Sequence, residues 1–247
     1  MTYPLIRKIG SYTTLSEDEK RRLHDALGDS IRIFEPRRDM LREGEKPDRI
    51  FVLIDGWAMR YKTLPDGRRQ ITSFLLPGDL CDSHMFVLAQ MDHSIAALSH
   101  VTASELSRDM VLDLMERTPR LTQCLWWDTL VATSIQREWI VNIGRRDSAE
   151  RMAHLLVELL VRMRIVGRAS DGHFDMPATQ GDLADALGIT PVHTNRILQT
   201  LRTANLIQLD RKTLTILDEE GLKKLAGFNT SYLHLDREGQ HLSANET

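Results

Sequence analysis

Short apolar runs alternate with turn residues in the first part of the chain, a pattern typical of β-strands. The runs IRIF, RIFVLIDGWAMRYKTL, RQITSFLL and SIAAL are rich in branched and aromatic side chains and lie between Ile31 and Leu106. Gly44, Gly56, the PDG at 65–67 and the PGD at 77–79 stand between them. Strands interrupted by turn residues about every ten positions indicate an all-β sandwich or barrel.

Helical periodicity flanks this β-rich region. Before it, Thr14–Ala26 predicts a short helix, because Ser16 suits the N-cap and Glu19 stands where a capping box needs a glutamate. After it, Arg120–Asn142 contains neither glycine nor proline and predicts one helix of about six turns.

The predicted long helix has apolar residues on two sides. One stripe is interrupted by Asp128 and consists of Leu121, Leu125, Ala132, Ile135 and Trp139. A second stripe runs through Trp126, Leu130 and Ile140. A helix that is apolar on more than one side has a packing partner. That partner is either its own domain alone or also the same helix of a second chain in a homodimer.

The C-terminal half returns to helical periodicity. Ser148–Met163 predicts an amphipathic helix, and a hairpin or loop with Gly172 in its turn follows. Further on, LIQLDRKTLTILD predicts two strands around 210–212, and DEEGLKKLAGF predicts a closing helix. The tail at 229–247 is polar and is expected to be poorly ordered.

The stretch TQGDLADALGITPVHTNRILQTLRTANLI, from Thr179, predicts two helices that share one small core. Gly188 supplies the backbone freedom of a sharp turn. Thr190 suits the N-cap of the second helix and Pro191 its first turn. The core positions are Leu183, Ala184 and Leu187 on the first helix, Ile189 in the turn, and Ile197, Leu198 and Leu201 on the second. This is the spacing of a helix-turn-helix, although Thr194 is polar where such motifs bury a branched aliphatic residue.

The outer face of the second helix suits the major groove of DNA. It carries Pro191, Val192, His193, Asn195, Arg196 and Gln199. An arginine there can bind guanine O6 and N7 together. The following hairpin would be a wing, and its Arg211 and Lys212, with Arg202 on the helix, are candidate phosphate contacts.

Composition limits the other possibilities. The chain has 247 residues, long enough for two domains, with 42% hydrophobic and 27% charged residues. No apolar run reaches a membrane span and the N-terminus lacks a signal peptide's apolar core, so a cytoplasmic protein is expected. Its net charge of −3 argues weakly against non-specific coating of nucleic acid, yet leaves specific reading possible. Cys81 and Cys124 alone cannot form a four-cysteine iron–sulfur cluster.

Taken together, the order of elements resembles the Crp/Fnr family of bacterial transcription regulators over about residues 15–228. Gly44, Gly56, Gly78, the SAERMAHLL at 148–156 and the ADALGITPVHTNRILQTLR at 184–202 carry this resemblance. It implies an α+β fold: a cyclic-nucleotide-binding-like β-roll with a long dimerisation helix (about 120–142) in residues 1–145, then a winged helix-turn-helix in 146–228. It also implies a homodimer on palindromic double-stranded DNA, with RNA polymerase as a further partner if the protein is an activator.

The resemblance assigns roles on the reading helix. Arg196 matches the family's guanine-reading arginine, while Val192 replaces its common glutamate, so the operator should differ from the best-known half-site. His193 and Asn195 are further candidates. Thr179 matches a phosphate contact, and Gln180 stands where an arginine is often found.

The effector position departs from the cyclic-AMP-binding members, which use a Gly-Glu pair and an Arg-Ser pair. Asp79 replaces the glutamate, and His93 stands near the arginine with Asp92 before it and Ser94 after it. Cyclic AMP is therefore not expected. Haem is an alternative, because Cys81 and His84 lie roughly where the family's carbon monoxide sensor has its ligands. A member without any small-molecule effector is equally compatible with the sequence.

Two other classes remain as alternatives to a DNA-binding regulator. The chain could be an effector-binding module whose winged helix contacts protein. It could also be a metal-dependent cupin-like enzyme using His84, His93 and His100, but the spacing of these histidines does not place them consistently on one strand face. No nucleophile with an adjacent base is evident, so no enzymatic activity is expected.

Overall fold

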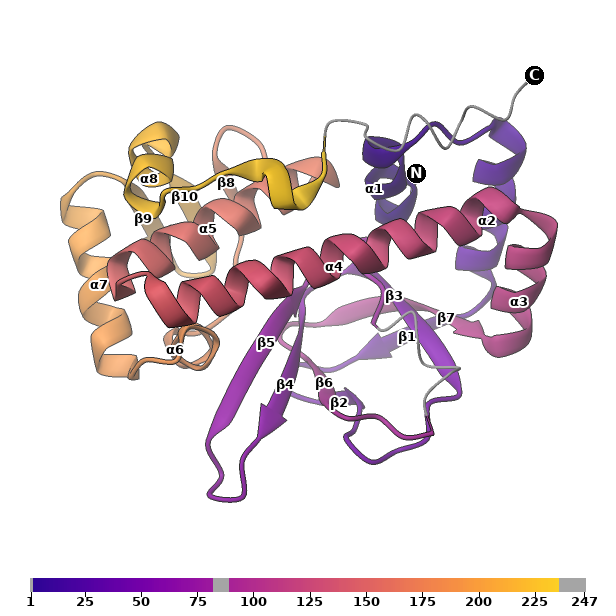
Figure 1. Cartoon of the computed structure of the whole chain (residues 1–247), viewed down its shortest axis with the longest axis horizontal. Coiled ribbons are helices and arrows are strands. Elements are labelled where there is room, and N and C mark those ends of the chain that lie inside the picture. Colours follow the sequence, from indigo (N-terminus) through magenta and orange to yellow (C-terminus); the bar gives the residue numbers. More distant parts are fainter. Residues whose placement is uncertain (1, 82–88, 236–247) are drawn as a thin grey trace. The chain divides into compact units, whose positions relative to one another are not determined.

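The computed structural model describes residues 2–81 and 89–235 (Figure 1). The chain divides into two compact units. Among the described residues, the first contains 2–60, 74–81, 89–135 and 231–235, and the second contains 61–73 and 136–230. None of the helices in the described part is long and apolar enough to cross a membrane.

Antiparallel strands form the two sheets of the predicted β-rich region. One sheet has the order β1-β7-β3, and the other has the order β2-β6-β4-β5. The strands are β1 (Ile31–Phe34), β2 (Asp39–Leu41), β3 (Arg49–Asp55), β4 (Ala58–Thr63), β5 (Arg69–Leu75), β6 (Ser94–Ala97) and β7 (Val101–Ser107). The sheet prediction is confirmed, with β2 and β7 as additional strands that the apolar runs did not indicate.

A glycine is required between β3 and β4. Gly56 has a φ of +80°, and a Cβ there would stand 2.0 Å from the carbonyl oxygen of His100. Any side chain would therefore force the two backbone segments apart.

Three helices pack on the β1-β7-β3 sheet side of the first unit: α1 (Pro4–Tyr12), α2 (Glu17–Asp29) and α3 (Arg108–Arg117). The predicted capping box of α2 is confirmed: Ser16 accepts from the Glu19 N–H, and Glu19 accepts from the Ser16 N–H. Helix α1 was not predicted. It buries Leu5, Ile6 and Ile9 in the core of this unit.

The long helix α4 (Pro119–Arg145) exceeds the predicted range at both ends. Its two apolar stripes differ in burial. Leu121, Ile135 and Trp139 are buried as the first stripe requires, whereas Ala132 is exposed and Val131 is buried in its place. Asp128, which interrupts this stripe, is itself buried. The second stripe is exposed: Trp126 is 73% accessible, Leu130 58% and Ile140 70%.

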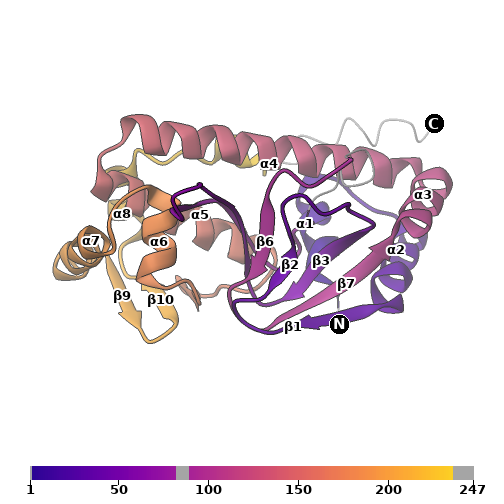
Figure 2. The same cartoon turned by 90° about the horizontal axis from the view of Figure 1, so that it is seen from below.

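In the second unit, four helices and a small sheet form a separate core. The helices are α5 (Ser148–Ile165), α6 (Gln180–Leu187), α7 (Pro191–Thr203) and α8 (Glu219–Ala226). The sheet has the order β8-β10-β9, with β8 (His173–Asp175), β9 (Ile207–Asp210) and β10 (Thr213–Ile216). Figure 2 shows β9 and β10 side by side. The predicted wing strands and closing helix are therefore confirmed.

The polar tail begins later than predicted. Residues Thr230–Leu233 form a 3-10 turn (η1), and Leu233 is buried. The ring of His234 lies 5.8 Å from the ring of Trp127. The expectation of poor order from residue 229 is wrong for 229–235, because an apolar side chain anchors this segment. The remaining tail lies outside the described residues.

A threonine side chain lies inside the helix-turn-helix core. Thr194 of α7 is fully buried, and its hydroxyl has no hydrogen-bond partner among the described residues. A buried hydroxyl without a partner loses its hydration and gains nothing in return.

We predict that Thr194→Val stabilises the protein by about 1 kcal/mol, because valine keeps the shape and removes the unpaired hydroxyl. Urea unfolding monitored by circular dichroism measures the change. Thr200→Val is the matched control: Thr200 is exposed on the same helix, and its hydroxyl donates to the Arg196 carbonyl at 3.1 Å. An equal or lower midpoint for Thr194→Val than for wild type would contradict the assignment.

Candidate nucleic-acid interface and sensor pocket

The turn between α6 and α7 follows from local sequence signals. Gly188 ends α6 with a φ of 65°, in the left-handed region where a glycine is favoured. Thr190 caps α7 by accepting from the His193 N–H at 3.2 Å, and Pro191 occupies the first turn. The predicted core positions are buried, with Ile189 partly exposed in the turn. The motif therefore presents one fixed face of α7 to solvent.

Most of the predicted reading residues lie on this face. Pro191, Val192, Asn195, Arg196 and Gln199 are exposed. Within the described residues, no ion pair or side-chain hydrogen bond holds the Arg196 guanidinium, so its five donors face solvent. This is the state expected of a group that waits for an external acceptor.

His193 differs from its neighbours. Its Nε2 lies 2.7 Å from the hydroxyl of Ser148, the first residue of α5. The imidazole thus joins the start of α7 to the start of α5. A role in base reading stays a prediction, and it would have to be made with one ring nitrogen already engaged.

At the start of α6, an acidic residue takes up the donors of Thr179. The N–H and hydroxyl of Thr179 both donate to Asp182 Oδ2, at 2.8 and 2.7 Å. Arg69 of β5 binds the other oxygen of Asp182 at 3.0 Å and Asp185 at 2.8 Å. The phosphate contact predicted for Thr179 requires Asp182 to release its hydroxyl, whereas the neighbouring Gln180 is exposed.

The wing presents two basic residues. Arg211 and Lys212 connect β9 to β10 and are exposed. Arg211 has a positive φ of 52°, and the Lys212 carbonyl accepts from the Met176 N–H at 2.7 Å. Arg202 at the end of α7 is also exposed. All three side chains are exposed, and their role as phosphate contacts stays a prediction.

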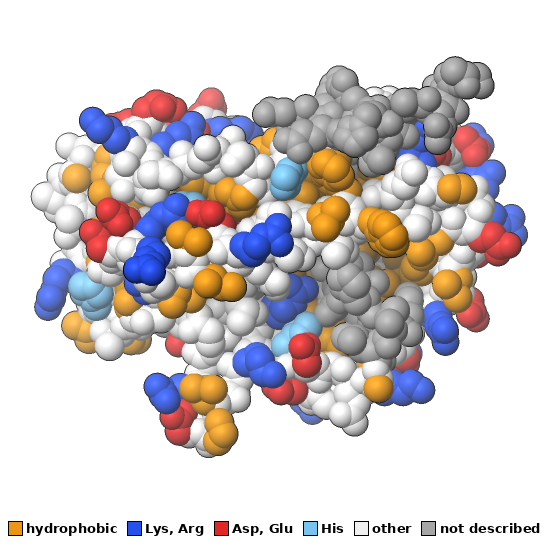
Figure 3. Space-filling view, in the orientation of Figure 1, with side chains coloured by type: hydrophobic (Ala, Val, Ile, Leu, Met, Phe, Trp, Pro, Cys, Tyr) orange, Lys and Arg blue, Asp and Glu red, His pale blue; other side chains and the backbone are white. Residues whose placement is uncertain are grey.

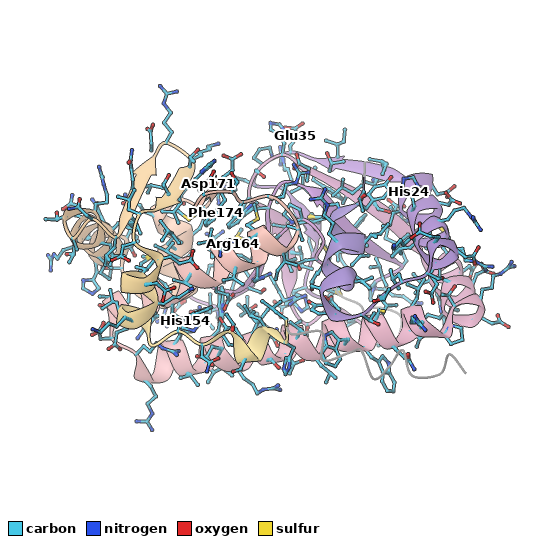
Figure 4. All side chains as sticks on the ribbon, turned by 90° about the horizontal axis from the view of Figure 1, so that it is seen from above. His24, Glu35, His154, Arg164, Asp171 and Phe174 are labelled. Carbon is cyan, nitrogen blue, oxygen red and sulfur yellow. The ribbon has the colours of Figure 1, made fainter. Side chains whose placement is uncertain are left out.

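A buried polar network joins the end of α4 to α5. His154 of α5 (labelled in Figure 4) is fully buried, and its Nδ1 lies 3.1 Å from the Asn142 side-chain amide. Burial, reinforced by nearby Arg146, lowers the pKa of His154 to about 3, so the ring is neutral. Glu158, one turn further on, accepts from Trp139 Nε1 at 3.2 Å and pairs with Arg162 at 3.3 Å.

At the predicted effector position, the Asp79 carboxylate is already paired. Lys8 of α1 binds Asp79 at 2.7 Å and Asp128 of α4 at 2.5 Å. The second oxygen of Asp79 accepts from the Leu76 N–H at 2.8 Å. An incoming ligand would have to replace the ammonium group of Lys8 to reach this carboxylate.

His93 is held between a cation and an anion. Arg60 Nε donates to His93 Nε2 at 3.1 Å, and Asp92 binds His93 Nδ1 at 2.6 Å. Because a guanidinium can only donate, the ring proton of a neutral His93 lies on Nδ1, toward Asp92. Ser94 accepts from the Glu43 N–H at 3.0 Å.

Of the two candidate haem ligands, Cys81 and His84, the structure describes only Cys81. Cys81 is fully buried, and its N–H donates to the Phe51 carbonyl at 2.8 Å. His84 lies outside the described residues. Burial raises the pKa of the other cysteine, Cys124, to about 12, so that thiol stays protonated. Within the ranges 2–81 and 89–235, no three His, Cys, Asp or Glu side chains form a group suited to a metal ion.

Three basic residues at these sites were missed by the sequence interpretation: Lys8, Arg60 and Arg69. Arg60 and Arg69 each lie within a predicted strand, where a charged residue in an apolar run is a signal for a paired site. Lys8 precedes Tyr12 by one helical turn, so the helix that carries it had to be recognised first.

Comparison with known proteins agrees with this geometry. Residues 31–118 match the cyclic nucleotide-binding domain, and residues 150–225 match the Crp-like helix-turn-helix domain. An anaerobic regulatory protein of Haemophilus influenzae is 28% identical over 90% of this chain and 86% of its own length. The transcriptional activator protein FnrL of Cereibacter sphaeroides is 28% identical over 76% of each chain. The solved structure of FixK2 from Bradyrhizobium japonicum has a TM-score of 0.72 at 22% identity, covering 81% of this chain and 98% of that one.

Proposed function

The chain belongs to the Crp/Fnr family of transcription regulators, and from this premise we propose that Arg196 and its neighbours on α7 read the operator. The protein is a sequence-specific DNA-binding regulator that acts as a homodimer. The observation that carries the proposal is the exposed row on α7, in which Arg196 has no partner among the described residues. Two such helices related by a two-fold axis read a palindromic site.

The exposed stripe of α4 supports the dimer. Trp126, Leu130 and Ile140 are large apolar side chains that the described part of the chain leaves accessible. Apolar side chains gather along this helix on the face shown in Figure 3. A large exposed apolar patch is costly in water and marks an interaction surface. Pairing α4 with its copy removes the stripe from water.

The reading face favours a distinct half-site. Arg196 is proposed to bind guanine O6 and N7, and Val192, which is 73% accessible, is suited to a thymine methyl group. Arg202, Arg211 and Lys212 are proposed to bind phosphates. RNA polymerase is proposed as a further partner if the protein activates transcription. Run-off transcription from a promoter that carries the selected operator shows whether the protein activates or represses transcription.

We propose that the β-roll of this member does not use cyclic AMP. The buried cluster of Lys8 with Asp79 and Asp128 carries one positive and two negative charges. A phosphate would meet this negative balance, and Asp92 stands beside His93 where the cyclic-AMP-binding members carry an arginine. Haem stays an alternative, which the absorption spectrum of the purified protein tests.

Two further classes have separate tests. A metal-dependent enzyme would contain stoichiometric metal, which elemental analysis detects. A module that contacts protein would ignore duplex DNA even at low salt, whereas binding through phosphates is strong there and falls steeply as salt rises.

Leu130→Glu is expected to separate the dimer, because it places a charge in the apolar seam. We expect the dimer dissociation constant, measured by analytical ultracentrifugation, to rise at least about 100-fold. Leu112→Glu is the matched control, since Leu112 is an exposed leucine of α3 outside the stripe. Equal dissociation constants for the two variants would contradict the proposal that the α4 stripe is the dimer interface.

Arg196→Ala is expected to lose about 1–3 kcal/mol of discrimination at one base pair of each half-site. In vitro selection first defines the operator, and gel-shift titration against single-base variants then measures the loss. The control Arg202→Ala should weaken binding to all sequences alike and reduce the salt slope by about 1. If Arg196→Ala weakened all sequences equally, Arg196 would be a phosphate contact and not a reader.

Cyclic AMP at about 1 mM is expected to leave the thermal midpoint unchanged within about 1 °C, because a ligand raises the midpoint only when it binds the folded state. The selected operator duplex is the positive control and should raise it. A saturable increase with cyclic AMP would contradict the proposal that the β-roll does not use this nucleotide.

A further inference from the structure

Three segments that are distant in the sequence meet at one buried ion cluster. Lys8 lies on α1, Asp79 follows Gly78 in the turn after β5, and Asp128 lies on α4. The Lys8 ammonium is 2.7 Å from Asp79 Oδ1 and 2.5 Å from Asp128 Oδ1. The three side chains are 15%, 10% and 11% accessible. One cation therefore bridges the β-roll turn and the long helix, away from most of the solvent.

Attraction between the buried Lys8 ammonium and the two carboxylates stabilises this bridge. Burial by itself would lower the pKa of Lys8, but Asp128 and Asp79 together raise it above its ordinary value. The ammonium therefore stays charged throughout the pH range of ordinary assays. Without it, two carboxylates would face each other in a poorly hydrated site, and removing one partner of a buried ion pair is strongly destabilising.

A second contact fixes α1 against α4. Tyr12 lies one helical turn after Lys8, on the same face of α1. Its ring is 6.0 Å from the ring of Trp127, the residue before Asp128. Leu5 and Ile9 of the same helix are buried in the core of the first unit. Two consecutive residues of α4 are thus gripped by one helix.

The contacts of Trp127 and Asp128 with α1 determine which side of α4 faces solvent. Asp128 is buried, while Trp126 and Leu130, two positions before and after it, are exposed members of the stripe. Successive helix positions are about 100° apart, so fixing the direction of Asp128 fixes the direction of its neighbours. A rotation of α4 about its axis would turn the stripe away from a partner helix.

We propose that Lys8 is a positioning residue for dimerisation: by tying Asp79 to Asp128, it fixes the rotation of α4 that presents Trp126 and Leu130 to the second subunit. This inference rests on the proposed use of the α4 stripe as the dimer seam. It makes α1, which precedes the region matched to the cyclic nucleotide-binding domain, a part of the dimer apparatus.

The test compares the full-length wild-type protein with Lys8→Met, which keeps the length of the side chain and removes its charge. Analytical ultracentrifugation measures the dimer dissociation constant, and circular dichroism measures the thermal midpoint. We expect Lys8→Met to raise the dissociation constant at least about tenfold while remaining folded at the assay temperature. Lys8→Arg, which keeps a buried cation between the carboxylates, should stay within about threefold of wild type.

Lys20→Met is the matched control. Lys20 pairs with Glu17 on the surface of α2, and a surface pair of this kind contributes little. The dimer dissociation constant of Lys20→Met should equal that of the wild-type protein. If Lys8→Met is unfolded at the assay temperature, Asp128→Asn decides by the same tenfold criterion, because the amide keeps the shape of the side chain and removes its charge.

A folded Lys8→Met or Asp128→Asn protein that dimerises like wild type would overturn the inference and leave the proposed seam intact. A wild-type protein that stays monomeric would overturn the proposed dimer itself. The Leu130→Glu variant separates the two results, because it acts on the seam directly and leaves the ion cluster in place.

Discussion

The long helix α4 has apolar side chains on two sides, and one chain covers only one of them. The inward side packs into the first unit through Leu121 and Ile135, while Trp126, Leu130 and Ile140 remain accessible. This constraint accounts for the rest of the functional arrangement. In the proposed dimer, a second copy of α4 covers the exposed stripe, and the symmetry of that pair supplies two α7 helices for one DNA site. On this proposal, a palindromic operator would follow from a packing requirement on α4.

Local signals made the reading motif predictable, whereas charged contacts over long sequence distances were not. Gly188, Thr190 and Pro191 act within one turn of the backbone, so their effect is visible in a short stretch of sequence. Lys8 meets Asp79 and Asp128 only after the β-roll has folded, across 71 residues in the nearer case. For the same reason, Asp128 was interpreted as an interruption of the apolar stripe, although it is buried with a cation beside it. The α1 helix was missed because its nine residues carry no side-chain N-cap.

The predicted effector position illustrates how the neighbours of a residue determine what it can bind. From the sequence, Asp79 and His93 appear as weak substitutes for a glutamate and an arginine. In the structure, Lys8 pairs with Asp79, and His93 lies between Arg60 and Asp92. The polar groups that would recognise a nucleotide are thus satisfied within the chain. A ligand gains little from replacing hydrogen bonds that already exist, because the exchange leaves the number of paired groups unchanged.

At the connection from α4 to α5, buried polar side chains are also hydrogen-bonded within the chain, but the consequence is different. His154 and Glu158 are fully buried, and Asn142, Trp139 and Arg162 pair with them. Apolar residues of the same volume would stabilise the fold equally well or better, since a buried charge pair seldom adds stability over a hydrophobic replacement. Hydrogen bonds, however, have preferred directions, and apolar contacts do not. The network therefore restricts the rotation of α5 about the end of α4. A reader that must place two helices about one turn of DNA apart, roughly 34 Å, depends on such a restriction more than on additional stability.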